Sequence, residues 1–156
     1  MVAAIAIGTK AQKILANVGF PWAFHTARDA VGEVKPGFIC TSTALTAHTY
    51  DVELPDAAND IAAGIALRNP EHDIDTAYTQ WDEFELALVG GGHLVWCQLH
   101  TNSVGKFGTK LEATVAGAGS VVSMTEANVI EQCGITYLET ATYANTQPTL
   151  MILTPG

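Results

Sequence analysis

The sequence predicts an all-β protein, a small antiparallel β-barrel or sandwich with an extended N-terminal arm. Apolar and polar residues alternate over short runs, as they do in strands that bury one face. Turn-forming residues recur about every 8–12 positions, a spacing typical of sandwiches and barrels. The apolar run at residues 84–99 is interrupted by Gly90-Gly91-Gly92. Three glycines inside a helix would cost roughly 2–3 kcal/mol relative to alanine, which argues against a buried helix there.

Residues 1–31 are expected to form the N-terminal arm, and residues 32–156 a single β-barrel domain. The apolar residues of the arm show no period of two, and the composition changes at Gly32. We expect Trp22 and Phe24 to anchor the arm on a neighbouring subunit, because buried aromatic side chains are common interface hot spots. The alternative is that these two rings close one end of the domain's own core.

The first part of the domain predicts three strands. A turn at Lys35-Pro36-Gly37 leads into a short strand at residues 38–40. The alternating, threonine-rich residues 43–54 predict one longer strand. A compact apolar run predicts a third strand over residues 61–67, in which Gly64 indicates a bulge or the close approach of another backbone.

Residues 84–99 are expected to form a hairpin at the centre of the domain, with its turn at Gly90-Gly91-Gly92. Side chains alternate across a strand, and here both faces carry apolar groups, so at least one face must be buried. Consecutive glycines supply positive φ angles without steric cost, as a tight connection requires.

The last third of the chain predicts further short strands. One begins at Leu111, a second covers residues 121–124, and residues 129–137 form either two strands or one kinked strand. A glycine-rich turn at residues 116–120 separates the first two, and a final strand closes the chain from Thr149 onward.

Composition and charge restrict the classes of partner. The net charge is −9, and residues 79–156 hold two lysines and no arginine, which argues against nucleic-acid binding. No apolar run reaches the roughly 18 residues of a membrane span, and residues 1–7 lack the basic flank of a signal peptide. Only 23 of 156 residues are charged, too few to cover a monomer in the usual way. We therefore expect a homo-oligomer, most simply a trimer.

No residue pattern predicts an enzyme, a cofactor or a metal site. The five histidines are scattered, and no two lie two or four positions apart. Three cysteines without CxxC spacing argue against zinc, redox and disulfide roles, and Cys97 and Cys133 are expected to be buried free thiols. The familiar nucleophile, metalloprotease and nucleotide-binding motifs do not occur.

Residues 69–84 predict an acidic loop or a single helical turn. Asp73 and Asp75 have the spacing of a calcium loop, but the later ligands and the central glycine are missing, so a solvated loop is favoured over a cation site. One alternative function is a small-molecule or glycan-binding β module that uses Trp81, Trp96 and this loop. Another is a hydrolase with paired carboxylates in residues 71–85.

The order of several short motifs resembles that of small β-barrel decoration, or cement, proteins of tailed viruses that infect bacteria or archaea. In these proteins a strand ending in G-x-AL precedes an acidic loop, alternating strands surround a glycine turn, and later G-x-L and GI-x-L-E segments follow. Trp81 stands where glycine is usual before the acid of the loop. The resemblance covers residues 32–155. The matching segments are Gly64-Ile65-Ala66-Leu67, Asp75-Thr76-Ala77-Tyr78, Asp82, Gly90 to Gly92, Gly108-Thr109-Lys110-Leu111 and Gly134-Ile135-Thr136-Tyr137-Leu138-Glu139.

The resemblance implies a non-enzymatic virion protein that decorates and stabilises an icosahedral capsid. Its implied partner is the lattice of the major capsid protein, on which such proteins often sit as trimers. It also implies a location on the capsid surface after assembly in the host cytoplasm. The sparse charge agrees with this, because interfaces are depleted in lysine and acidic residues.

Overall fold

A computed structural model describes residues 24–46, 48–57, 60–101, 103, 106–124, 132–137 and 147–154. These residues form ten strands and one short 3-10 helix, and they contain no α-helix, which confirms the all-β prediction. The elements are β1 (Phe24–Asp29), β2 (Ile39–Thr46), β3 (Thr49–Glu53), β4 (Ala62–Ala66), β5 (Glu83–Leu88), β6 (Leu94–Leu99), β7 (Lys110–Ala113), η3 (Val115–Gly117), β8 (Val121–Ser123), β9 (Gln132–Thr136) and β10 (Gln147–Leu153).

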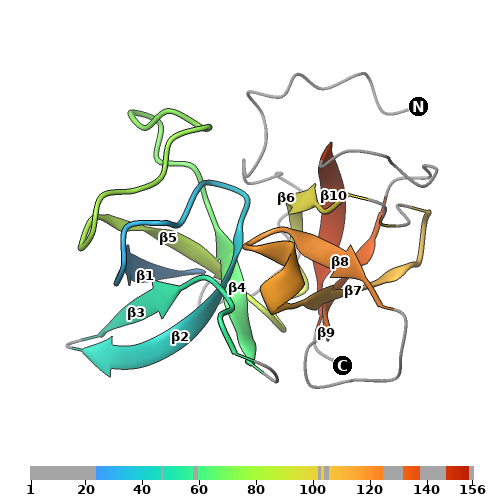
Figure 1. Cartoon of the computed structure of the whole chain (residues 1–156), viewed down its shortest axis with the longest axis horizontal. Coiled ribbons are helices and arrows are strands. Elements are labelled where there is room, and N and C mark those ends of the chain that lie inside the picture. Colours follow the sequence, from blue (N-terminus) through green and yellow to red (C-terminus); the bar gives the residue numbers. More distant parts are fainter. Residues whose placement is uncertain are drawn as a thin grey trace.

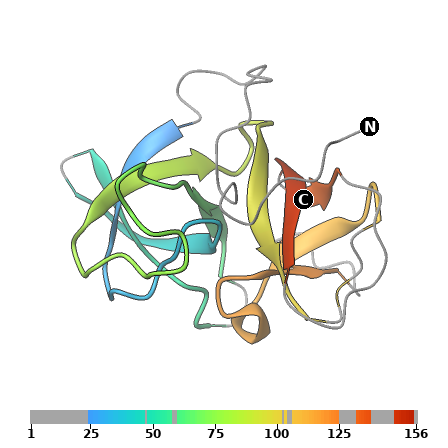
Figure 2. The same cartoon turned by 90° about the horizontal axis from the view of Figure 1, so that it is seen from above.

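The strands close into two five-stranded barrels that lie side by side (Figures 1 and 2). The first has the strand order β1-β3-β2-β4-β5, and the second has the order β10-β6-β8-β7-β9. Most pairs are antiparallel, whereas β1 with β3 and β6 with β8 are parallel. The predicted barrel is therefore confirmed, but residues 32–156 contribute to two barrels where one was expected. Closure leaves few backbone groups free for strand addition.

The hairpin predicted at residues 84–99 is wrong, although both of its strands exist. β5 pairs with β1 and β4 in the first barrel, whereas β6 pairs with β10 and β8 in the second. Gly90 and Gly92 adopt the positive φ angles expected of a turn, but Gly92 N donates to Leu153 O at 3.1 Å in the second barrel. The glycine turn thus carries the chain from one barrel to the other.

The single strand predicted at residues 43–54 is also wrong, because the run folds into the hairpin β2–β3. The two strands are antiparallel, with Thr46 opposite Thr49. His48 has a φ of +71°, so the backbone reverses there in a left-handed conformation that the sequence did not signal.

Gly64 confirms the prediction of a close backbone approach. A β-carbon at this position would overlap the carbonyl oxygen of Ala87 in β5. The β2–β4 register also shifts between Cys40 and Thr41, beside the glycine. The tight β4–β5 contact therefore requires glycine.

Two apolar clusters form the core, and one of them spans both barrels. One cluster fills the first barrel around Val52, Phe84 and Leu86. A second cluster joins Ile39 and Ile65 of the first barrel to residues such as Val95, Leu111 and Met151 of the second. Two backbone hydrogen bonds also cross the junction, from Ile39 N to Gly119 O at 2.8 Å and from Gln98 N to Gly37 O at 3.1 Å. This packing fixes the relative position of the barrels.

The first strand begins inside the segment predicted to be an arm. Residues 24–29 form β1, which pairs with both β3 and β5 of the first barrel. The alternation pattern did not predict this strand, because one of its fully buried positions is the polar Asp29. Phe24 is half-buried and packs on the ring of His93, with a centroid distance of 4.0 Å. Trp22 and the rest of residues 1–23 lie outside the described residues, so the arm stays a prediction for that segment.

Several predicted strands and the predicted burial of the cysteines are confirmed. β4, β7, β8 and β10 lie where strands were predicted, and β9 accounts for the described part of residues 129–137. The three cysteines are buried free thiols. Burial raises the pKa of the Cys97 and Cys133 thiols, which keeps both protonated and unreactive. Within the described part of the chain, no helix has the length and apolar character needed to cross a membrane.

Candidate functional site

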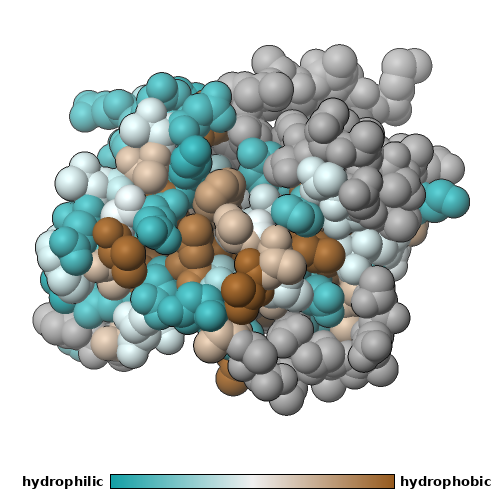
Figure 3. All heavy atoms as spheres, viewed as in Figure 1, coloured by the Kyte–Doolittle hydropathy of each residue, from teal (hydrophilic) through white to brown (hydrophobic). Residues whose placement is uncertain are grey.

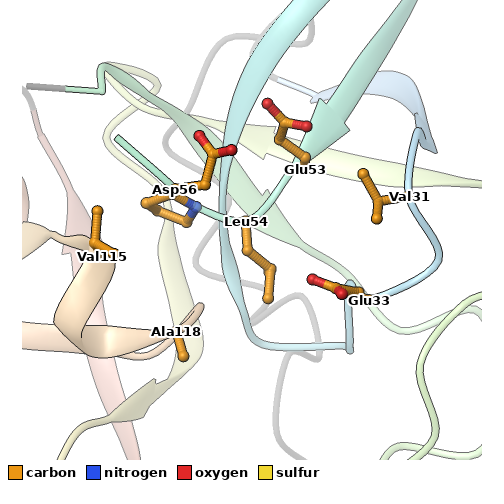
Figure 4. Close-up of a pocket in the computed structure, with 8 residues that line it drawn as sticks. Val31, Glu33, Glu53, Leu54, Asp56, Val115 and Ala118 are labelled. Carbon is orange, nitrogen blue, oxygen red and sulfur yellow. The ribbon is translucent and has the colours of Figure 1, made fainter. Parts of the chain in front are cut away.

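A hollow of about 270 Å³ lies where the two barrels meet (Figure 4), and we call it the junction groove. Three segments that are far apart in the sequence supply its walls: the loop after β1, the end of β3 with the residues that follow, and η3 with the turn after it. The lining residues are Val31, Glu33, Glu53, Leu54, Pro55, Asp56, Val115 and Ala118.

Apolar side chains form the floor and part of both walls. Leu54 lies between the wall that carries Val31 and the wall that carries Val115 (Figure 4). Val31 and Val115 are 50% and 48% exposed, so each leaves about half of its surface in water. Apolar surface exposed beside polar residues is typical of interaction sites.

A second hollow of about 510 Å³ adjoins the groove and shares Glu53 with it. Ile61 lies on this hollow and is 70% exposed. Apolar patches extend across the middle of the face seen in Figure 3, from the first barrel to the second. Exposed apolar surface therefore continues beyond the groove at Ile61.

Carboxylates border the groove. Glu33, Glu53 and Asp56 line it, and Asp60 lies nearby in the adjoining hollow. Partial burial raises the pKa of Glu53, and the negative charges of Asp56 and Asp60 raise it further. An apolar floor with a negative rim fits a lysine or arginine side chain, which has an aliphatic stem and a cationic head.

Asp29 holds the β1-side wall in place. Its side chain is fully buried, and one carboxylate oxygen accepts hydrogen bonds from Val31 N at 3.0 Å and Gly32 N at 2.7 Å. The other oxygen accepts from Val34 N at 2.7 Å. These bonds shape the loop that presents Val31 and Glu33 to the groove.

Gly119 lets the wall that carries Val115 pack closely on Leu54 at the floor of the groove. The turn after η3 places Ala118 and Gly119 in left-handed conformations, with φ angles of +45° and +86°. A β-carbon on Gly119 would overlap the Phe38 ring and press on Leu54. The absence of a side chain at this glycine therefore lets the second barrel approach the first.

The acidic segment at residues 69–82 forms a loop, as predicted, and much of its polar chemistry is internal. Asp73 accepts from Asp75 N at 3.2 Å, and Asp82 accepts from Thr79 N at 3.0 Å. Tyr78 anchors the loop, because its buried hydroxyl donates to Leu67 O at 2.8 Å. Among the described residues, no three His, Cys, Asp or Glu side chains are grouped as metal ligands.

The two tryptophans assigned to the alternative glycan site differ in accessibility. Trp96 is only 6% exposed and cannot line an open cleft. Trp81 is 52% exposed, and the Arg28 guanidinium lies 4.9 Å from its ring centre. Its φ of +72° lies in the left-handed region that glycine adopts most readily. Of these two tryptophans, Trp81 is therefore the one whose ring is accessible for stacking on a ligand.

A further exposed aromatic pair lies on the second barrel. Phe107 and Tyr137 are 66% and 43% exposed, and their ring centres are 6.0 Å apart. The Thr136 hydroxyl donates to Lys106 O and accepts from Thr109 N, which holds the turn that carries Phe107 against β9. The two residues lie in separate segments, so no local sequence pattern indicates that they form a pair.

The sequence patterns also gave no indication of the junction groove. Residues 31–33, 53–56 and 115–118 each have the composition of an ordinary loop or turn, and no local pattern links them. The contrast between exposed valine or isoleucine and nearby acids is visible only after the barrels are placed together.

No protein-family model matches the chain, and no curated protein matches it in sequence. Several solved structures share its fold, among them two from phages. The N base of the head fibre gp8.5 in bacteriophage phi29 is 15% identical, with a TM-score of 0.52, over 83% of this chain and 92% of that one. A chain from the capsid of Myoviridae phage XM1 is 15% identical, with a TM-score of 0.50, over 99% of this chain and 98% of that one. The predicted likeness to small β proteins of phage capsids is thus confirmed at the level of the fold.

Proposed function

We propose that this protein is a structural component of a tailed-virus particle that decorates the capsid and stabilises it by binding the lattice of the major capsid protein. The observation that carries the proposal is the likeness to a phage XM1 capsid chain over nearly the full length of both proteins. The phi29 head-fibre base, which has the same fold, supports it.

The surface of the described residues suits a protein that is covered by partners. Apolar side chains of Val31 and Val115 are exposed in the junction groove, and that of Ile61 is exposed in the adjoining hollow. Phe107 and Tyr137 are exposed elsewhere. Interfaces are rich in aromatic residues and poor in lysine and acidic residues at their centres. Binding to a lattice would remove such surfaces from water, at about 25 cal/mol for each Å² of apolar area.

The proposal includes a homo-oligomer, most simply a trimer, and an arm that binds a neighbouring subunit. Trp22 is the proposed anchor of this arm. Phe24 belongs to β1, and we assign it the role of fixing the base of the arm on the barrel through its contact with His93.

The test is the composition of purified virions. The proposal expects the chain in a fixed ratio to the major capsid protein, as measured by quantitative mass spectrometry. Particles that lack the chain should lose their DNA at a lower temperature, and adding back the full chain should restore their stability. Absence of the chain from purified particles would reject the proposal.

A glycan-binding module is the second candidate, and exposed Trp81 is the observation that favours it. A glycan array probed with the full chain would show hits, and Trp81→Ala would abolish them. Phe107→Ala is the matched control, because it removes another exposed ring away from the acidic loop. Hits that survive Trp81→Ala would argue against this site. The hydrolase alternative has no comparable support, because Asp73 and Asp82 are engaged in capping turns.

A further inference from the structure

We propose that the junction groove binds residues 1–23 of a neighbouring copy of this chain, with Lys10 and Lys13 beside Glu53 and Asp56. The inference rests on the proposed homo-oligomer and names the surface that would build it. The occupant is thus a cationic, apolar segment of the same protein.

Charge complementarity is the first argument. Residues 1–23 contain Lys10 and Lys13 and no arginine, aspartate or glutamate, so the segment carries a positive charge. The rest of the chain holds the other five of seven cations and all 16 carboxylates. The groove concentrates part of this negative charge, with Glu53 and Asp56 on its rim.

Apolar chemistry is the second argument. Residues 1–23 include Ile14 and Leu15 directly after Lys13, so cationic and branched aliphatic side chains are adjacent in the sequence. The groove offers the matching combination of an apolar floor at Leu54 and half-exposed walls at Val31 and Val115. Burial of aliphatic groups would supply affinity, and the charges would set the orientation.

The place where the segment joins the barrel favours a neighbour over the chain's own groove. Residues 1–23 enter β1 at Phe24, whereas Val31 of the groove follows the opposite end of that strand. From Phe24 to Asp29 the strand extends about 16 Å, at about 3.3 Å per residue, and Val31 lies beyond its end. To reach its own groove, the segment would have to double back along the outside of a closed barrel. A neighbour's groove needs no reversal, and such head-to-tail contacts form a ring when the rotation between copies closes.

Hydrogen bonds hold both walls of the groove in place before any segment binds. Asp29 fixes one wall through three backbone hydrogen bonds, and the hydrogen bond from Ile39 N to Gly119 O holds the other barrel in place. Little ordering of the groove would be required on binding, which favours affinity.

The experiment is a charge swap in the full chain, followed by light scattering and sedimentation at micromolar concentration. We expect the wild type to self-associate. K10E/K13E and E53K/D56K should each raise the dissociation constant by at least about tenfold, because like charges would then face each other. The matched controls are K106E/K110E and E71K/D73K, which change the net charge equally outside the two proposed surfaces and should leave association unchanged.

Two combinations separate a contact between copies from a contact within one chain. A chain that carries both swaps should regain self-association. Mixing K10E/K13E with E53K/D56K should restore association between unlike variants in a one-to-one ratio, because the arm of each variant then meets a groove of opposite charge on the other variant, whereas contacts between like variants stay repulsive. A monomeric wild type, swap variants that associate like the wild type, or failure of both combinations would overturn the inference. Circular dichroism and the melting temperature confirm that each variant folds.

Failure of this inference is distinguishable from failure of the proposed function. Charge-swap variants that associate normally, for a protein that is present in virions, would overturn only the groove assignment. Self-association through the groove, for a protein that is absent from virions, would overturn only the capsid role.

Discussion

Replacing Asp29 with alanine tests whether one buried carboxylate holds the loop that forms the groove wall. The change removes the acceptor for the backbone N–H groups of Val31, Gly32 and Val34. Hydrogen bonds to a charged group contribute about 1.5–3 kcal/mol each. Part of that sum is offset, because the alanine variant no longer keeps a carboxylate away from water. The expected loss in the free energy of unfolding is therefore about 3–5 kcal/mol.

Equilibrium unfolding in urea, followed by tryptophan fluorescence, measures this loss. The melting temperature should fall by roughly 10 °C, since about 2–4 °C accompany each kcal/mol in a chain of this size. Asp73→Ala is the matched control: its carboxylate also accepts from a backbone N–H, at Asp75, but it is exposed, so the cost should stay within about 1 kcal/mol. Equal losses in the two variants would refute the reasoning.

Three further predictions concern the groove and the acidic loop. Gly119→Ala should destabilise the protein by about 2–4 kcal/mol, since a side chain would be strained at φ +86° and would overlap Phe38; a melting temperature near that of the wild type would contradict this. Glu53→Gln should flatten the pH dependence of stability. Burial raises the pKa of Glu53 in the folded state, so the fold binds its proton more tightly than the unfolded chain does, and stability rises as pH falls from neutral through that pKa. Thermal melts between neutral and mildly acidic pH measure the slope, which should remain in the wild type and weaken in the variant. Tyr78→Phe should cost about 1–2 kcal/mol, because Leu67 O and Asn69 N lose a buried hydroxyl partner. Urea unfolding tests it, and an unchanged midpoint would argue against the anchor.

Strand positions were largely determined by local sequence. Alternation and turn residues were enough to place β4, β7, β8 and β10, because side-chain period and backbone sterics act within a few residues. Gly64 signalled a close backbone approach for the same reason, since only glycine avoids overlap with Ala87. The charge contrast between residues 1–23 and the rest of the chain is likewise written in the sequence.

Strand partners and the groove were decided by tertiary structure. The alternation in residues 84–99 showed that both faces of the strands are apolar, but not that β5 and β6 enter different barrels. Such a pattern indicates how much of a strand is buried, but it does not specify which neighbouring strand or barrel buries it. Val31, Glu53 and Val115 become neighbours only because the two barrels share a core and are joined by the hydrogen bond from Ile39 to Gly119. Their proximity depends on contacts between distant parts of the chain, which local periodicity cannot encode.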